Sequence, residues 1–336
     1  MKHGILILGL IVLPIMILMM VCSKDENQQL DDLMSSTYTP DRPGAAIAVV
    51  KNGEVVFKKG YGIADLDTKA PITSSTNFNI CSMTKAFTAY AVLDLAAQGK
   101  LSLDDPIIKF FPDFNPMTGN QITVRHLLTH SSGMVDHYGY VDQSLFTEFW
   151  DKDVLNAVKS VDSTCFPVGT CYRYSNTAFC LSAQIIEQVT GQSYPDFIKT
   201  DIFQPLQMNA SDVIKPDFAI AQRAMGYRFE NDSFIIADAA QSLFFSTQGD
   251  GGIYTSIDDY LKWISAIQSG HGLNADQINA AQSPQFYIDS TKHFAYGFGW
   301  FTAGTGDDWV IYHTGSNGGF RTIIMMKPSQ KYAVVV

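Results

Sequence analysis

The sequence predicts an α+β protein, an α/β sandwich in which an antiparallel sheet is built from both chain ends and flanked by helices, with a mostly helical region inserted between the two sheet parts. Two β-rich runs open the folded part, in "AAIAVVKNGEVVFKKGYGIAD". Helical periodicity then dominates the middle of the chain. Further β-rich runs, "FAYGFGWFTA", "DDWVIYHTG", "FRTIIMMKP" and "KYAVVV", close the sequence.

Local signals predict where individual elements begin and end. Asn52-Gly53, between the first two β-rich runs, is a strong hairpin signal because both residue types tolerate the positive φ of a tight turn. Apolar residues recur every four positions over 87–95, which predicts a helix. A second helix is predicted over about 177–190, and a third begins near Ser256, which stands where an N-cap is expected.

Composition excludes some classes of function. The chain has 336 residues, 46% of them hydrophobic and 17% charged, which is an ordinary globular balance. Its net charge is −10 and its strongest basic run is Lys58-Lys59, so no basic stripe exists to neutralise a phosphate backbone. Nucleic acid is therefore not an expected partner.

The first 22 residues, "MKHGILILGLIVLPIMILMMVC", are typical of a secretory or membrane-anchoring segment. Two fates stay open: acylation of Cys22 as in a lipoprotein, or an uncleaved anchor that binds the membrane. The polar residues 23–42 are interpreted as a tether. We expect an exported protein of the cell envelope, in a periplasm or on the outer face of a membrane.

The remaining cysteines are too few for a disulfide scaffold in a chain of this length. Cys165 and Cys171 bracket the turn-rich stretch "FPVGT" and could close a small loop by a disulfide in an oxidising compartment. The alternative is a pair of reduced, buried thiols.

Three short motifs hold the residues with catalytic potential. Ser82 and Lys85 lie three apart in the first turn of the first predicted helix, so the lysine amine can reach the serine hydroxyl. Taken alone this spacing is a weak signal. The sequence also contains "YSN" at 174–176 and "HTG" at 313–315, and each motif occurs once. Their order is that of active-site serine hydrolases that recognise penicillins.

With these motifs, the chain resembles the β-lactamase-related family of class C β-lactamases, serine D-Ala-D-Ala carboxypeptidases, esterases and D-aminopeptidases. The resemblance covers about 43–336 and includes "GYGIADLDTKAPIT", "LSLDDPIIKFFPDF", "ITVRHLLTHSSGM" and "FPVGTCYRYSNTAF". It implies one catalytic domain of the β-lactamase/transpeptidase-like fold, with sheet parts at about 43–75 and 290–336 and a mainly helical part at about 76–289. Family members usually continue into another strand and a helix, so we expect the chain to be truncated after Val336.

The resemblance assigns roles to residues of this sequence. Ser82 would be the acylated nucleophile and Lys85 its proton partner. Tyr174 would be the second acid/base group, and Asn176 a donor that orients Lys85 and the substrate. The backbone N–H groups of Ser82 and Ser316 would form the oxyanion hole, which stabilises the tetrahedral intermediate.

The third motif departs from the β-lactamase version, which has lysine where this chain has His313. Together with Thr314 and Gly315, His313 would form the substrate-binding strand. A histidine with a pKa near roughly 6.5 is mostly neutral at pH 7, whereas lysine offers a substrate carboxylate a permanent charge. We therefore expect D-alanyl-peptide carboxypeptidase or carboxylesterase activity on small peptide or ester substrates, including cell-wall peptides. The alternatives are a class C-like β-lactamase and a non-hydrolysing penicillin-binding sensor.

No cofactor or metal is expected. His126 and His130 are four apart in "HLLTHSSGM" and could share an ion, but no HExxH motif or further ligand cluster accompanies them. Both histidines are therefore interpreted as structural.

Overall fold

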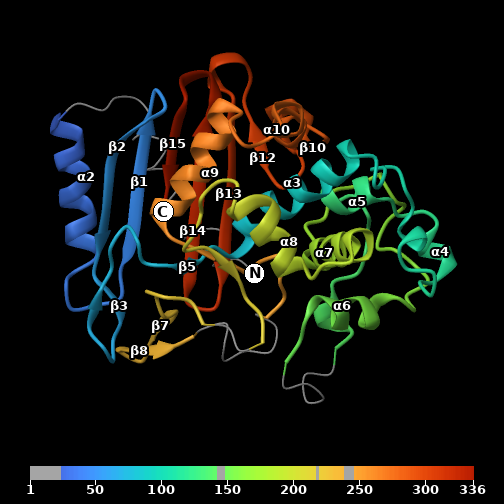
Figure 1. The fold of residues 1–336 in the computed structure, drawn as a ribbon, viewed down its shortest axis with the longest axis horizontal. Coiled ribbons are helices and arrows are strands. Elements are labelled where there is room, and N and C mark those ends of the chain that lie inside the picture. Colours follow the sequence, from blue (N-terminus) through green and yellow to red (C-terminus); the bar gives the residue numbers. More distant parts are fainter. Residues whose placement is uncertain (1–23, 142–147, 217–218, 238–245) are drawn as a thin grey trace.

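The computed structural model describes residues 24–141, 148–216, 219–237 and 246–336. Its main sheet is antiparallel, in the order β10-β11-β12-β13-β14-β15-β1-β2 (Figure 1). The strands are β1 Ala45–Lys51, β2 Glu54–Tyr61, β10 Phe286–Asp289, β11 Phe294–Tyr296, β12 Phe301–Ala303, β13 Val310–Asn317, β14 Phe320–Lys327 and β15 Tyr332–Val335. Because β1 and β2 pair onto strands from the other end of the chain, the predicted α+β class is confirmed.

The helical region fills the right of Figure 1 and separates the two sheet parts in sequence. Its helices are α3 Thr84–Ala97, α4 Pro116–Gly119, α5 Val124–Leu128, α6 Asp151–Val158, α7 Asn176–Thr190 and α8 Tyr194–Ile198; α9 Ile257–Ser269 and α10 Ala275–Gln282 follow. Short strands also occur outside the main sheet: β3 Ile63–Asp65, β4 Ala70–Pro71, β5 Phe78–Asn79, β6 Asp212–Val213, β7 Tyr227–Glu230, β8 Ser233–Ile236 and β9 Ile253–Thr255. β3 and β4 lie within the predicted sheet part at about 43–75, whereas the other short strands, which lie in the predicted helical part, were not predicted.

The turn between β1 and β2 has the conformation expected of a tight hairpin. Asn52 and Gly53 have φ values of 55° and 82°, the conformation that the hairpin signal predicts. On its other side β1 pairs with β15, with Val49 opposite Val334. The last strand therefore lies inside the sheet, between β14 and β1.

Alternating side chains give the sheet two apolar faces. Ala48 and Val335 point into the large core shared with α3, α7 and α9. Val49 and Val334 point the other way, into a smaller cluster that includes Leu30. Helices therefore cover both faces of this part of the sheet.

The expected tether at 23–42 is wrong for residues 24–37, which form the helix α2 Lys24–Thr37. Its Leu30 and Met34, one turn apart, are 5% and 8% exposed and pack on β1, β2 and β15. Asp31 accepts hydrogen bonds from Tyr61 Oη at 2.7 Å and Lys59 Nζ at 2.6 Å. These contacts, with a hydrogen bond from Asn27 Nδ2 to the Val56 carbonyl at 3.0 Å, hold an otherwise polar segment on the sheet.

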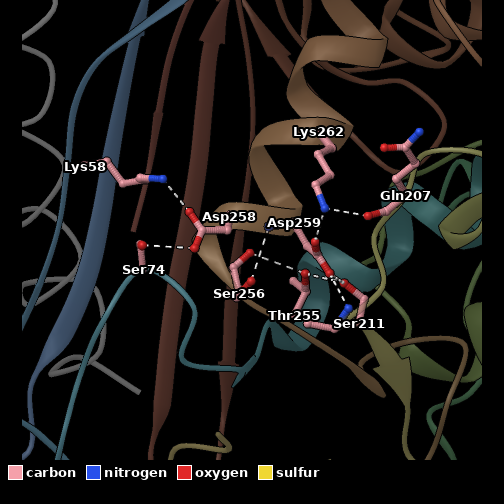
Figure 2. Close-up of polar contacts among 10 residues, drawn as sticks. Lys58, Ser74, Gln207, Ser211, Thr255, Ser256, Asp258, Asp259 and Lys262 are labelled. Carbon is pink, nitrogen blue, oxygen red and sulfur yellow. Dashed lines mark hydrogen bonds and ion pairs between the residues drawn. The ribbon is translucent and has the colours of Figure 1, made fainter. Parts of the chain in front are cut away.

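Figure 2 shows how the first turn of α9 is fixed to its surroundings. Ser256 caps the helix, as predicted, by accepting from the Asp259 N–H. The buried Asp259 carboxylate accepts from Ala210 N–H at 2.8 Å and Ser211 Oγ at 3.0 Å. Asp258 pairs with Lys58 on β2, so α9 is joined both to the sheet and to the loop before β6.

For Cys165 and Cys171 the structure shows the reduced alternative and not the disulfide, but the expected burial of the two thiols is wrong. Cys165 and Cys171 are free, exposed thiols, and Cys165 Sγ accepts a hydrogen bond from Arg173 Nη1 at 2.7 Å instead. Residues 1–22, including Cys22, lie outside the described part of the chain. Within the described ranges no helix has the length and apolar character needed to cross a membrane.

The docking of α2 predicts a stability difference between two leucines of one helix. Leu30→Ala should lower the free energy of unfolding by about 2 kcal/mol or more, because it opens a cavity against the sheet. Leu33 is 51% exposed, so Leu33→Ala should change it by less than about 0.5 kcal/mol. Urea unfolding followed by circular dichroism measures both. Equal effects would mean that α2 does not pack as described.

Candidate active site

Ser82 lies in a tight turn that leads into α3. The turn, Cys81–Met83, is a 3₁₀ helix, and α3 begins at Thr84, so Ser82 lies just before α3 and not in its first turn as predicted. Cys81 has φ 52°, a conformation rare for a residue with a side chain, and its N–H donates to Asn79 Oδ1 at 2.6 Å. The Cys81 thiol is buried, which raises its pKa, while Ser82 is half-buried. The serine is thus the accessible nucleophile of this turn.

Lys85 is fully buried and uses all three of its possible hydrogen bonds. Its Nζ lies 3.1 Å from Ser82 Oγ, 2.9 Å from Asn176 Oδ1 and 2.7 Å from the backbone oxygen of Asp250. These partners come from three separate segments of the chain. The predicted pair Ser82 and Lys85 therefore meets the predicted Asn176, together with a backbone group that the motifs do not mark.

The chemical nature of the three partners defines what Lys85 can do. The amide oxygen of Asn176 and the carbonyl of Asp250 only accept hydrogen bonds, whereas the Ser82 hydroxyl can accept or donate. An ammonium form donates to all three. A neutral amine donates to Asn176 and Asp250, and its lone pair is then directed at the Ser82 hydroxyl. The arrangement suits transfer of the serine proton to Lys85.

Asn176 and Tyr174 are positioned by the start of α7. Ser175 caps that helix by accepting from the Ala178 N–H. Asn176 Nδ2 donates to Tyr138 Oη at 3.1 Å, which leaves its oxygen turned to Lys85. The Tyr174 ring centroid lies 5.0 Å from Lys85 Nζ, within range of a cation–π contact. The four residues assigned to catalysis are thus adjacent.

His130 supports this segment, a task that the sequence did not reveal. Its Nδ1 accepts from Ser175 N–H at 3.1 Å and its carbonyl accepts from Arg173 N–H at 2.9 Å, so both neighbours of Tyr174 are held. Burial, with Lys85 nearby, holds the pKa of His130 well below its usual range, so the ring stays a neutral acceptor. His126 instead accepts from Thr123 N–H through Nδ1 in the cap of α5. Both histidines have the structural roles expected of them.

Strand β13 approaches the nucleophile closely because Gly315 has no side chain. A Cβ at Gly315 would lie 2.5 Å from the Ile80 carbonyl and 2.8 Å from Cys81 Cβ. Thr322, opposite Gly315 on β14, also donates to that Ile80 carbonyl at 2.8 Å. The strand that bears Thr314 and Ser316 is therefore packed against the Ser82 turn, as the oxyanion-hole prediction requires.

His313 is placed differently from the expectation of a substrate contact, because its side chain is only 1% exposed. Nδ1 lies 2.7 Å from the Thr314 carbonyl and must donate to it. Nε2 lies 3.1 Å from Tyr296 Oη and, without a proton, accepts from it. Burial and the Lys85 charge lower the pKa of His313 to about 3. The ring is therefore a neutral, internal part of the site wall.

Comparisons with known proteins place this geometry in a family. The family model described as Beta-lactamase matches residues 28–336. The chain belongs to the β-lactamase family. This is a family of serine hydrolases that share one fold, and membership does not by itself specify the substrate.

Relatives in the β-lactamase family differ in what their names describe. Protein flp of Staphylococcus aureus is 29% identical over 329 residues, which cover 94% of this chain and 63% of the relative, so this chain spans less than two thirds of that protein. The octameric penicillin-binding protein homologue of Pyrococcus abyssi is 26% identical with a TM-score of 0.81, over 94% of this chain and 73% of that one. A D-amino acid amidase of Ochrobactrum anthropi is 25% identical with a TM-score of 0.71, over 86% and 84%.

The buried position of His313 predicts its titration. In the folded protein its ring should remain neutral from about pH 8 down to about pH 5, whereas in the urea-unfolded chain histidine titrates near roughly 6.5. Because the unfolded state binds the proton more tightly, this residue's contribution to stability is lost as the pH falls from about 6.5 towards 3. NMR of histidine-labelled protein, with His313→Gln to assign the signal, measures this. A native midpoint between about pH 5 and 8 would contradict the described environment.

Proposed function

We propose that the protein is an exported serine hydrolase that cleaves peptide or ester carbonyls through an acyl-enzyme on Ser82. The observation that carries this proposal is the contact of Lys85 Nζ with Ser82 Oγ at 3.1 Å, fixed by two further acceptors. A serine beside a buried lysine is the arrangement of a nucleophile and its proton acceptor.

Acylation follows from this arrangement. Ser82 Oγ attacks the substrate carbonyl carbon while its proton moves to Lys85 Nζ or, through the same cluster, to Tyr174. The tetrahedral oxygen accepts from the backbone N–H groups of Ser82 and Ser316, each contributing on the order of 3 kcal/mol of transition-state stabilisation. The leaving amine or alcohol departs with a proton from Lys85 or Tyr174. Water then attacks the ester and releases the acid.

The substrate preference rests on the neutral His313. A β-lactam or peptide carboxylate gains little from an uncharged ring that is buried and already hydrogen-bonded at both nitrogens. Simple esters, which carry no carboxylate, are therefore favoured over β-lactams. The similarity to a D-amino acid amidase supports an acyl donor with a D-residue.

Two alternatives remain distinct from this proposal. A class C-like β-lactamase would hydrolyse cephalosporins quickly in spite of His313. A non-hydrolysing penicillin-binding sensor would form the acyl-enzyme and not release it. Since acylation already uses Lys85 and Tyr174, release of the acid product is what distinguishes the hydrolase from the sensor.

Location in the cell envelope is part of the proposal and rests on residues 1–22. Their apolar run would direct export, and the membrane would be reached through that segment or through an acylated Cys22. Cell-wall peptides would then be available as substrates.

Steady-state rates on p-nitrophenyl butyrate, a D-Ala-D-Ala peptide and nitrocefin test the function and its preference together. Nitrocefin should be the slowest of the three. Ser82→Ala should lower kcat by on the order of 10⁴- to 10⁶-fold on the best substrate. Ser265→Ala, on the exposed side of α9, is the matched control and should behave as the wild type. Fast nitrocefin turnover would overturn the preference, and unchanged activity of Ser82→Ala would overturn the mechanism.

A further inference from the structure

The third acceptor of Lys85 belongs to a loop and not to a helix or strand. The Asp250 carbonyl accepts from Lys85 Nζ at 2.7 Å, and strand β9 begins only at Ile253. Without this acceptor a neutral Lys85 could rotate and turn its lone pair away from Ser82. What holds the loop of residues 248–250, here called the acceptor loop, therefore bears on catalysis.

Asp151, the first residue of α6, binds the acceptor loop by two hydrogen bonds. Its Oδ1 accepts from Gln248 N–H at 3.0 Å and its Oδ2 accepts from Gly249 N–H at 2.9 Å. The Asp151 side chain is 1% exposed, so water does not compete for these bonds. One carboxyl group thus accepts hydrogen bonds from two consecutive backbone N–H groups directly before Asp250.

Helices α3 and α7 enclose the acceptor loop on its other sides. Thr88 on α3 donates to the Gly249 carbonyl at 2.7 Å. A Cβ at Gly249 would lie 2.5 Å from the Phe179 carbonyl on α7, so the loop backbone lies directly on that helix. Helix α3 therefore carries Lys85, which donates to the Asp250 carbonyl, and through Thr88 it also binds the loop that carries this carbonyl.

We propose that Asp151 is a positioning residue for acylation: by fixing the acceptor loop it keeps the Asp250 carbonyl on Lys85 Nζ and so directs the lysine lone pair at Ser82. The inference rests on the proposed function and deepens it. Asp151 touches no reacting atom and acts through the backbone of Gln248 and Gly249.

The surroundings of Asp151 decide which substitution tests this role. The titratable groups that face it are the Asp250 side chain on the loop, Cys180 on α7 and Tyr194 on α8. Burial, with Asp250 as the next cause, raises the pKa of Asp151 to about 8. In either protonation state both carboxyl oxygens can accept a hydrogen bond, whereas the amide nitrogen of Asn cannot. Asp151→Asn therefore sets a donor against one of the two loop N–H groups with almost no change in volume.

Asp259 supplies a matched control, because it is another buried carboxylate that binds loop groups, Ala210 N–H and Ser211 Oγ, but on the α9 side (Figure 2). Asp151→Asn should lower kcat/KM for p-nitrophenyl butyrate by about 10- to 100-fold, the cost of a misplaced catalytic group. The loss should be in kcat with little change in KM, because Asp151 touches no substrate atom and acts only on the placement of the proton acceptor. Asp259→Asn should lower the free energy of unfolding and keep both kcat and KM.

Thr88→Val provides an independent test should Asp151→Asn not fold, because it removes a different contact of the same loop. It should lower kcat by about 3- to 10-fold with little change in KM. Wild-type kcat in the folded Asp151→Asn or Thr88→Val proteins would overturn the positioning role while leaving the proposed function intact. Equal activity of the wild type and Ser82→Ala would instead overturn the proposed function itself.

Discussion

The three hydrogen bonds of Lys85 Nζ are the constraint on which the rest of the site depends. A buried amine in an apolar core is costly unless each of its donors has a partner. Here Asn176 and the Asp250 carbonyl take two donors and leave one direction, toward Ser82. The same hydrogen bonds thus offset the cost of burying the Lys85 amine and orient this amine toward Ser82.

Several surrounding segments pack closely around this cluster because glycines let their backbones approach neighbouring elements. Gly315 lets β13 reach the Ser82 turn, and Gly249 lets the acceptor loop lie on α7. Gly299 (φ 77°), between β11 and β12, completes the set: a Cβ there would lie 2.6 Å from the Lys85 carbonyl. Gly315 and Gly299 therefore pack against the Ser82 turn and the start of α3, while Gly249 packs against α7. His130 and Tyr138 perform the corresponding task for Tyr174 and Asn176 by hydrogen bonds.

Sequence reasoning found what side-chain type and spacing encode. The hairpin at Asn52-Gly53, helix α7 and the four residues assigned to catalysis all carry local signals, and the structure brings those four residues together. Sequence reasoning could not find the Asp250 carbonyl, because every residue has a carbonyl. Only the fold places this one beside Lys85, which lies 165 positions earlier in the chain. Helix α2 was missed because its polar composition hides two apolar positions that matter only once the sheet exists. The burial of His313 likewise depends on Tyr296, on a separate strand.

The central claim is that Ser82 is acylated with Lys85 as its proton partner. Intact-mass analysis and peptide mapping after exposure to an alkyl fluorophosphonate address it most directly. The account predicts one adduct per chain, located on Ser82, with labelling abolished in Lys85→Ala and unchanged in Lys100→Ala, whose side chain is exposed. An adduct on Cys81 or Tyr174 in place of Ser82, or labelling of Lys85→Ala at the wild-type rate, would contradict it.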